Sequence, residues 1–142
     1  MSDPSDLWSG LWARLDAGVT DADAPARTLA LATERTSGGG AVRMVVLRGL
    51  ERAVPSLTFY THAGSDKAFE LADEPHAEVL LWDAARSFQA RLAVEVDLAP
   101  GGPDLWETLS PGTRLNYVPL PAPGNTIDAP HVPVAAGPDA FM

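Results

Sequence analysis

The rare basic side chains of this sequence are the ones best suited to chemistry. Lys67 is the only lysine among 142 residues, and it follows Ser65 at the expected start of a short helix, where backbone N–H groups and the helix dipole favour an anion. Arg43 and Arg48 interrupt an apolar run, and their spacing of five places them on opposite faces of a strand. Ser65, Lys67 and one of these arginines could hold a phosphate. A surface lysine and two arginines paired with acidic neighbours would explain the same spacing equally well.

Other sequence patterns give little support for a metal site, a phosphate-binding loop or a nucleophilic serine. His62, His76 and His131 have no metal-ligand spacing, so no metal site is predicted. The glycines at 37–40 are typical of a hairpin turn rather than of a phosphate-binding loop, because no Gly-Lys-Ser/Thr string follows. The sequence contains no Gly-x-Ser-x-Gly elbow. The catalytic residues therefore stay unknown at this level.

The charge balance of the chain limits its partners. Nineteen acidic residues against ten basic ones give a formal net charge of −9, which repels nucleic acids and anionic membrane surfaces. The first residues lack a basic stretch followed by an apolar one, and no apolar run is long enough to cross a bilayer. The sequence thus predicts a soluble, cytoplasmic protein that binds neither nucleic acid nor membrane.

Hydrophobic periodicity predicts the elements that would carry these residues. Leu7, Trp8, Leu11, Trp12 and Leu15 recur at helical spacing, which predicts an amphipathic helix over about residues 5–17. Five apolar or alternating runs predict strands: 27–34, 41–50, 57–62, 77–83 and 87–98. Short helices fit 65–75 and 103–110, and a Pro-rich tail covers about residues 119–142.

The order of these elements indicates the fold class. Strands that follow one another nearly in series, with short helices between them, favour an antiparallel barrel over a doubly wound parallel sheet. The sequence predicts one domain over residues 1–142, mainly β with flanking helices and largely antiparallel.

Four strings in one order resemble the pyridoxamine 5′-phosphate oxidase family of FMN-binding split barrels. They are RMVVLR at 43–48, FYTHAGSDK at 59–67, LADEPHAEVLLW at 71–82 and FQARL at 88–92. The resemblance covers about residues 27–118. It implies a split β-barrel, FMN as the cofactor, and a homodimer with the pocket between its two subunits.

The resemblance also implies roles for single residues. Arg43 and Lys67 match positions that bind the FMN phosphate, and residues 43–48 match the strand along the flavin ring. The implied cofactor contacts are Arg43, Met44, Val45, Val46, Leu47, Tyr60, Thr61, Ser65, Lys67 and Gln89. Arg48 and Arg114 match substrate-side positions and are candidates for holding a small-molecule substrate.

Departures from the family pattern bear on the reaction. Asp66 stands where the oxidases usually carry a basic residue, which removes one phosphate contact and adds a negative charge. Trp106, Ser110 and Arg114 align only roughly with the residues that hold pyridoxal phosphate in the family. We therefore expect an FMN-dependent oxidoreductase that moves hydride or electrons to or from another small substrate than the B6 vitamers.

Two alternatives remain open from the sequence. The same barrel holds a deazaflavin or a haem in related families, and a non-catalytic flavin-binding module would carry the same motifs. In the family the chain continues beyond the position of Phe141 with strands that help complete the barrel, so we expect a second subunit to cover that edge.

Overall fold

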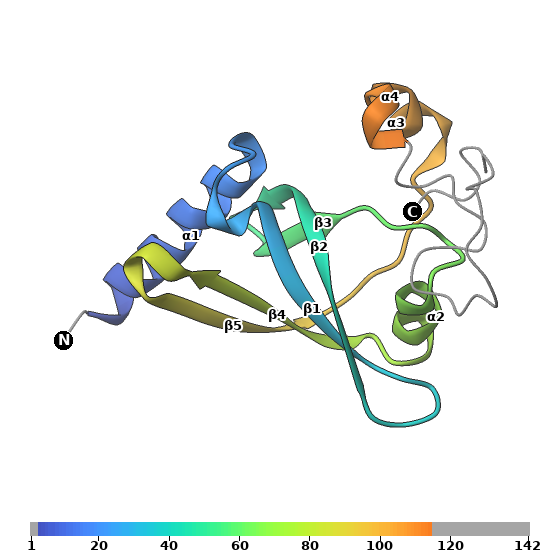
Figure 1. Ribbon diagram of the computed structural model, residues 1–142, viewed down its shortest axis with the longest axis horizontal. Coiled ribbons are helices and arrows are strands. Elements are labelled where there is room, and N and C mark those ends of the chain that lie inside the picture. Colours follow the sequence, from blue (N-terminus) through green and yellow to red (C-terminus); the bar gives the residue numbers. More distant parts are fainter. Residues whose placement is uncertain (1–2, 115–142) are drawn as a thin grey trace. The chain divides into compact units, whose positions relative to one another are not determined.

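The structure is a computed structural model that describes residues 3–114 (Figure 1). The predicted N-terminal helix is present as α1, which runs from Pro4 to Thr20. The remaining elements, in chain order, are η1 Pro25–Arg27, β1 Thr28–Glu34, β2 Gly40–Glu51, β3 Ser56–Phe59, α2 Asp66–Asp73, β4 His76–Asp83, η2 Ala84–Arg86, β5 Phe88–Glu95, α3 Gly102–Thr108 and α4 Pro111–Arg114. The Pro-rich tail and His131 lie outside the described residues.

The five strands form one sheet in the order β3-β2-β1-β4-β5. β1 pairs antiparallel with β4, with Leu31 opposite Val79, and β2 pairs antiparallel with β3. β1 and β2 are joined by a tight turn in which the Arg35 N–H donates to the Gly39 carbonyl at 2.9 Å. Gly38 and Gly39 have φ values of 91° and 84°, which only glycine adopts without strain. The hairpin predicted at 37–40 is therefore confirmed.

The described residues form two compact units. The first contains residues 3–32, 41–59 and 78–94, and the second contains residues 33–40, 60–77 and 95–114. The prediction of a single domain over the whole chain stays a prediction.

The core of the first unit lies between α1 and one face of the sheet (Figure 1). Buried and exposed positions alternate along β1 and β4, as expected for strands with one covered face. The buried apolar residues of this unit are Leu11, Trp12, Leu15, Ala26, Leu29, Leu31, Val45, Leu47, Val79 and Leu81.

Three contacts fix α1 against its surroundings in the first unit. Asp83 is 2% exposed, and its Oδ2 accepts a hydrogen bond from Arg14 Nε at 3.1 Å, while the Arg14 guanidinium lies 3.8 Å from the centre of the Phe88 ring. A Cβ on Gly18 would come within 2.6 Å of the Ala26 backbone, so only glycine permits this close approach. Packing of an amphipathic helix, rather than helix propensity alone, thus holds α1 in place.

The second unit contains α2, α3, α4 and the tip of the β1–β2 hairpin. Its buried apolar residues include Ala68 and Leu71 of α2, and Trp106 of α3 packs with Tyr60, Leu105 and Leu109. Polar side chains are also buried in this unit, namely Thr33, His62, Ser65 and Glu70. Because buried polar side chains need hydrogen-bond partners, the second unit is the candidate location of a binding site.

Candidate functional site

A short turn leads from Tyr60 to the first residue of α2. His62 accepts a hydrogen bond on Nδ1 from the Gly64 N–H at 2.9 Å, and the Ser65 N–H donates to the His62 carbonyl at 3.0 Å. A side-chain acceptor that bonds the N–H two residues later is the arrangement of an Asx turn, here made by an imidazole. His62 therefore shapes the turn from which α2 begins.

Ser65 caps α2 in the way its sequence position predicted. Its Oγ accepts from the Ala68 N–H at 3.3 Å and lies 3.1 Å from Thr61 Oγ1, and the residue has extended backbone geometry. The side chain is fully buried. A neutral cap satisfies one helix N–H without adding charge, so the positive end of the α2 dipole is not neutralised by the cap.

The imidazole of His62 lies in an unusual environment. Its side chain is 4% exposed, and Nε2 has no hydrogen-bond partner among the described residues. Because Nδ1 accepts from Gly64, the neutral ring carries its proton on Nε2. Burial lowers the pKa of His62 below its ordinary value, and the charge of Lys67 lowers it further.

The first turn of α2 carries two opposite charges. Lys67 is half-buried and close enough to His62 to lower its pKa, whereas Asp66 is exposed. On the buried side of the helix, Glu70 Oε1 accepts from Thr33 Oγ1 at 2.9 Å, which ties α2 to the end of β1 within the same unit. The turn thus collects a helix N-terminus, a cation and a buried imidazole within six residues.

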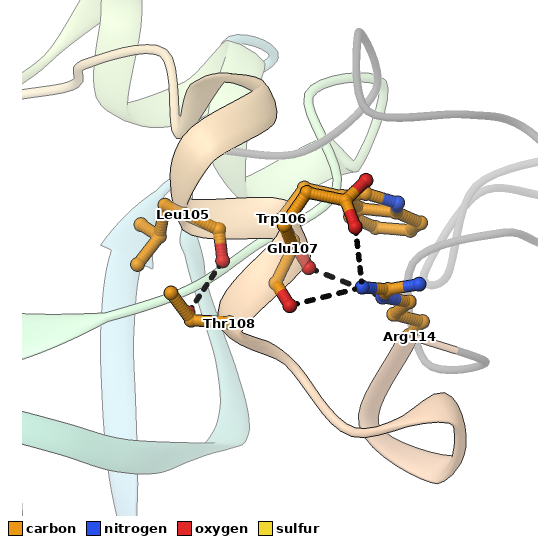
Figure 2. A network of polar contacts seen from close by, with 5 residues as sticks. All are labelled: Leu105, Trp106, Glu107, Thr108 and Arg114. Carbon is orange, nitrogen blue, oxygen red and sulfur yellow. Dashed lines mark hydrogen bonds and ion pairs between the residues drawn. The ribbon is translucent and has the colours of Figure 1, made fainter.

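Arg114 makes local contacts with α3. Its Nε donates to the Trp106 carbonyl and its Nη2 to the Glu107 carbonyl, each at 3.1 Å, as Figure 2 shows. Nη2 also lies 3.4 Å from the Glu107 carboxylate. Ser110 Oγ accepts from the Thr113 N–H at 3.1 Å at the start of α4. In this structure both side chains therefore bond the chain's own helices, and the substrate role of Arg114 stays a prediction.

The remaining predicted contacts belong to the first unit. Arg43 is half-buried on β2, where its Nη1 donates to the Leu31 carbonyl at 3.2 Å. Arg48 lies at a β-bulge between Leu47 and Gly49, so the simple alternation that placed it opposite Arg43 is interrupted. Gln89 is exposed on β5, which is separated from β2 by two strands of the sheet.

The structure thus groups the predicted site residues into two sets. Tyr60, Thr61, Ser65 and Lys67 come together in the second unit, whereas residues 43–48 and Gln89 belong to the first. Sequence reasoning missed His62, which it weighed only as a metal ligand. Its position two residues before a glycine and three before a helix-capping serine was the available signal.

Between residues 3 and 114 no group of three His, Asp or Glu side chains could hold a metal ion. Within the same stretch no helix is both long and apolar enough to cross a membrane.

Curated relatives match about half of this chain. The pyridoxine/pyridoxamine 5′-phosphate oxidase of Deinococcus deserti is 38% identical over 77 residues, which are 54% of this chain and 35% of that protein. The enzyme of the same name from Acinetobacter baumannii is 38% identical over 72 residues, 51% of this chain and 32% of that protein. The chain spans about a third of the length of these relatives. No protein-family model matches it.

Solved structures extend the likeness to the fold. A pyridoxamine 5′-phosphate oxidase-related, FMN-binding protein of Nostoc punctiforme matches 99% of this chain and 79% of its own, with a TM-score of 0.69 and 26% identity. PhzG of Burkholderia lata, solved with tetrahydrophenazine-1-carboxylic acid, matches 67% of this chain and 45% of its own, with a TM-score of 0.50 and 25% identity. In sequence and in fold, the chain resembles the pyridoxamine 5′-phosphate oxidase-related split-barrel proteins, as its motifs predicted.

Proposed function

We propose that the chain binds FMN, with the phosphate at the start of α2, and acts as a flavin-dependent oxidoreductase. The observation that carries the proposal is the segment from Thr61 to Lys67, which combines a helix N-terminus, a neutral buried cap and a lysine. This donor set suits a phosphate monoester, because the helix N–H groups and the ammonium both favour a dianion. The description of the Nostoc protein as FMN-binding supports the same assignment.

The roles of the chain's own residues follow from this placement. Lys67 would hold the phosphate as a point charge, and Tyr60 and Thr61 of the same unit would contact the cofactor. The family resemblance also assigns cofactor contacts to Arg43 and to residues 44–47 of β2, and these assignments stay predictions. FMN, when bound, would supply the hydride or electron transfer, and the protein would position it and tune it through nearby charge.

The B6 vitamers are not the substrates that we propose. Arg114 and Ser110, two of the three residues that align roughly with the positions that hold pyridoxal phosphate in the family, make their described hydrogen bonds within the segment 106–114. A substrate phosphate deprived of charge-assisted partners loses roughly 1.5 to 3 kcal/mol per contact. Turnover of pyridoxine or pyridoxamine 5′-phosphate at micromolar concentrations would overturn this part of the proposal.

The exposed face of the sheet supports a homodimer. Val42 is 70% exposed on β2, and Trp82 is 52% exposed on β4, where it stands between the buried Leu81 and Asp83. Leu80 and Ala30 are direct neighbours on this same outer face. Apolar residues gathered on one face commonly mark a protein interface. The separation of Gln89 from β2 by two strands also fits a flavin pocket that takes residues from two copies.

Two measurements test these proposals. The purified protein is titrated with FMN, riboflavin, a deazaflavin and haem, and binding is followed by absorption and fluorescence. Tighter binding of FMN than of riboflavin is expected, whereas preference for haem or deazaflavin would favour the alternatives. Sedimentation of the parent and of Trp82→Glu tests the dimer, with Ala85→Glu as a control on an exposed residue of η2. A parent that sediments as a monomer would refute it.

A further inference from the structure

The buried imidazole of His62 accepts a hydrogen bond that depends on its protonation state. Nδ1 accepts the Gly64 N–H at 2.9 Å, and the ring is 4% exposed. A protonated imidazole carries hydrogen on both nitrogens and has no acceptor. Protonation would therefore place two donors, Nδ1–H and the Gly64 N–H, against each other in a buried position.

The turn that this hydrogen bond holds is the one that presents the phosphate site. The Ser65 N–H donates to the His62 carbonyl at 3.0 Å, and Ser65 then caps the turn that carries Lys67. The positive charge of Lys67, on α2, acts on this ring. A second cation beside Lys67 in a buried site is costly, so an imidazolium would have to leave its position.

We propose that His62 is a positioning residue of the phosphate site, which holds the turn before α2 only as a neutral imidazole and releases the phosphate when protonated. The inference rests on the proposed function, since it concerns the phosphate of FMN at the start of α2. Binding and deprotonation are linked through one group, so FMN affinity falls with pH by up to about tenfold for each unit below the pKa of His62.

The test compares the pH dependence of FMN binding in three proteins. The dissociation constant is measured from about pH 8 to about pH 5 for the parent, for His62→Asn and for His76→Asn. Asparagine can still accept the Gly64 N–H through Oδ1 but does not titrate, so its curve should be flatter than that of the parent. His76→Asn removes an exposed imidazole after α2 and should follow the parent. The phosphate of FMN itself titrates in all three proteins, so the difference between curves isolates His62.

Each outcome decides something. A steeper loss of affinity at low pH in the parent than in His62→Asn supports the inference, and nitrogen NMR should then show Nδ1 of His62 unprotonated near neutral pH. Parallel curves in the presence of FMN binding overturn the inference and leave the proposed function intact. A parent that binds FMN more tightly at low pH than His62→Asn does would also overturn it, because the imidazolium would then attract the phosphate. Absence of FMN binding at every pH refutes the proposed function and the inference together.

Discussion

The two longest helices of the described chain begin in opposite ways. α1 starts after Asp3, an exposed carboxylate that accepts from the Ser5 N–H at 2.8 Å and from its hydroxyl at 2.7 Å. α2 starts after Ser65, a buried neutral hydroxyl, with Lys67 in its first turn. A carboxylate cap supplies the negative charge that a helix N-terminus favours and repels a second anion, whereas a serine cap leaves that preference to a ligand. Asp3 and Ser65 both cap a helix, but the start of α2 is better suited to bind a phosphate than the start of α1.

The largest effect that would test this contrast is on FMN binding. We expect Lys67→Met to raise the FMN dissociation constant roughly 10- to 150-fold, because a charge-assisted contact of roughly 1.5 to 3 kcal/mol is lost. Riboflavin, which lacks the phosphate, should bind as before. Arg35→Met is the matched control, since it removes one exposed positive charge from the same unit. Equal loss of both ligands in Lys67→Met would mean that the lysine acts on the fold and not on a phosphate.

The second effect concerns stability rather than binding. Ser65→Ala should lower the free energy of unfolding by about 1 to 2 kcal/mol, because it removes a buried cap and leaves Thr61 Oγ1 without this contact. Asp3→Ala removes an exposed cap and should cost less. Urea denaturation of both variants measures the two losses. A larger loss in Asp3→Ala would show that burial does not distinguish the two caps.

A third, smaller effect concerns the acidic charge in the first turn of α2 and its influence on FMN affinity. Asp66→Asn removes the acidic side chain from the first turn of α2 and should tighten FMN binding roughly two- to fivefold. Because Asp66 is exposed, the gain should shrink as salt is raised. Asp73→Asn, at the other end of the same helix, is the control. Equal gains from both substitutions would indicate a general charge effect instead of a local one.

The smallest effect is the pH dependence of stability. Hydrogen bonds from Ser5 lower the pKa of Asp3, which moves it further below neutral pH. The contribution of the α1 cap to stability should therefore not change near neutral pH. The pKa of His62 is lowered by burial and by Lys67, so the unfolded chain binds this proton more tightly than the folded one. The resulting stability is present above the ordinary histidine pKa of about 6.5 and is lost as pH falls through the lowered value.

Urea denaturation at stepped pH checks this last expectation. His62→Asn should lose stability less steeply on acidification than the parent. Lys67→Met removes one cause of the lowered His62 pKa, so the total loss of stability on acidification should be smaller than in the parent. His76 provides the opposite sign, because its bond to Glu74 raises its pKa and its contribution disappears as pH rises through that value. Identical slopes in the parent and His62→Asn would contradict the assignment of a buried neutral imidazole.

Much of the fold could be predicted because local signals were strong. Alternating apolar residues marked β1 and β4, the glycines at 37–40 marked the hairpin, and Ser65 marked the start of α2. Helix and strand periodicity is a property of the chain alone, so these elements needed no tertiary information. The bulge at Arg48 could not be predicted, because it depends on how β2 and β3 pair.

The charged residues of the site could be predicted from the sequence, but the contacts of its buried residues could not. Lys67 is conspicuous because it is the only lysine, whereas burial of His62 and its bond to Gly64 arise only once the turn has folded. Arg114 illustrates the converse, since a residue chosen by alignment makes its described bonds to backbone carbonyls eight and seven residues away. Residue type indicates what a side chain can do, and packing decides which of those contacts it makes.

The cluster of Trp106 with Tyr60 also gives the second unit its own optical signal. Trp106 is buried, as is Trp12 of the first unit, whereas Trp8 and Trp82 are about half exposed and should differ from both in emission wavelength and in access to a quencher such as iodide. A protein that keeps Trp106 as its single tryptophan would report the opening of the second unit alone. Such a reporter would reveal whether the two units unfold in one cooperative step or in two.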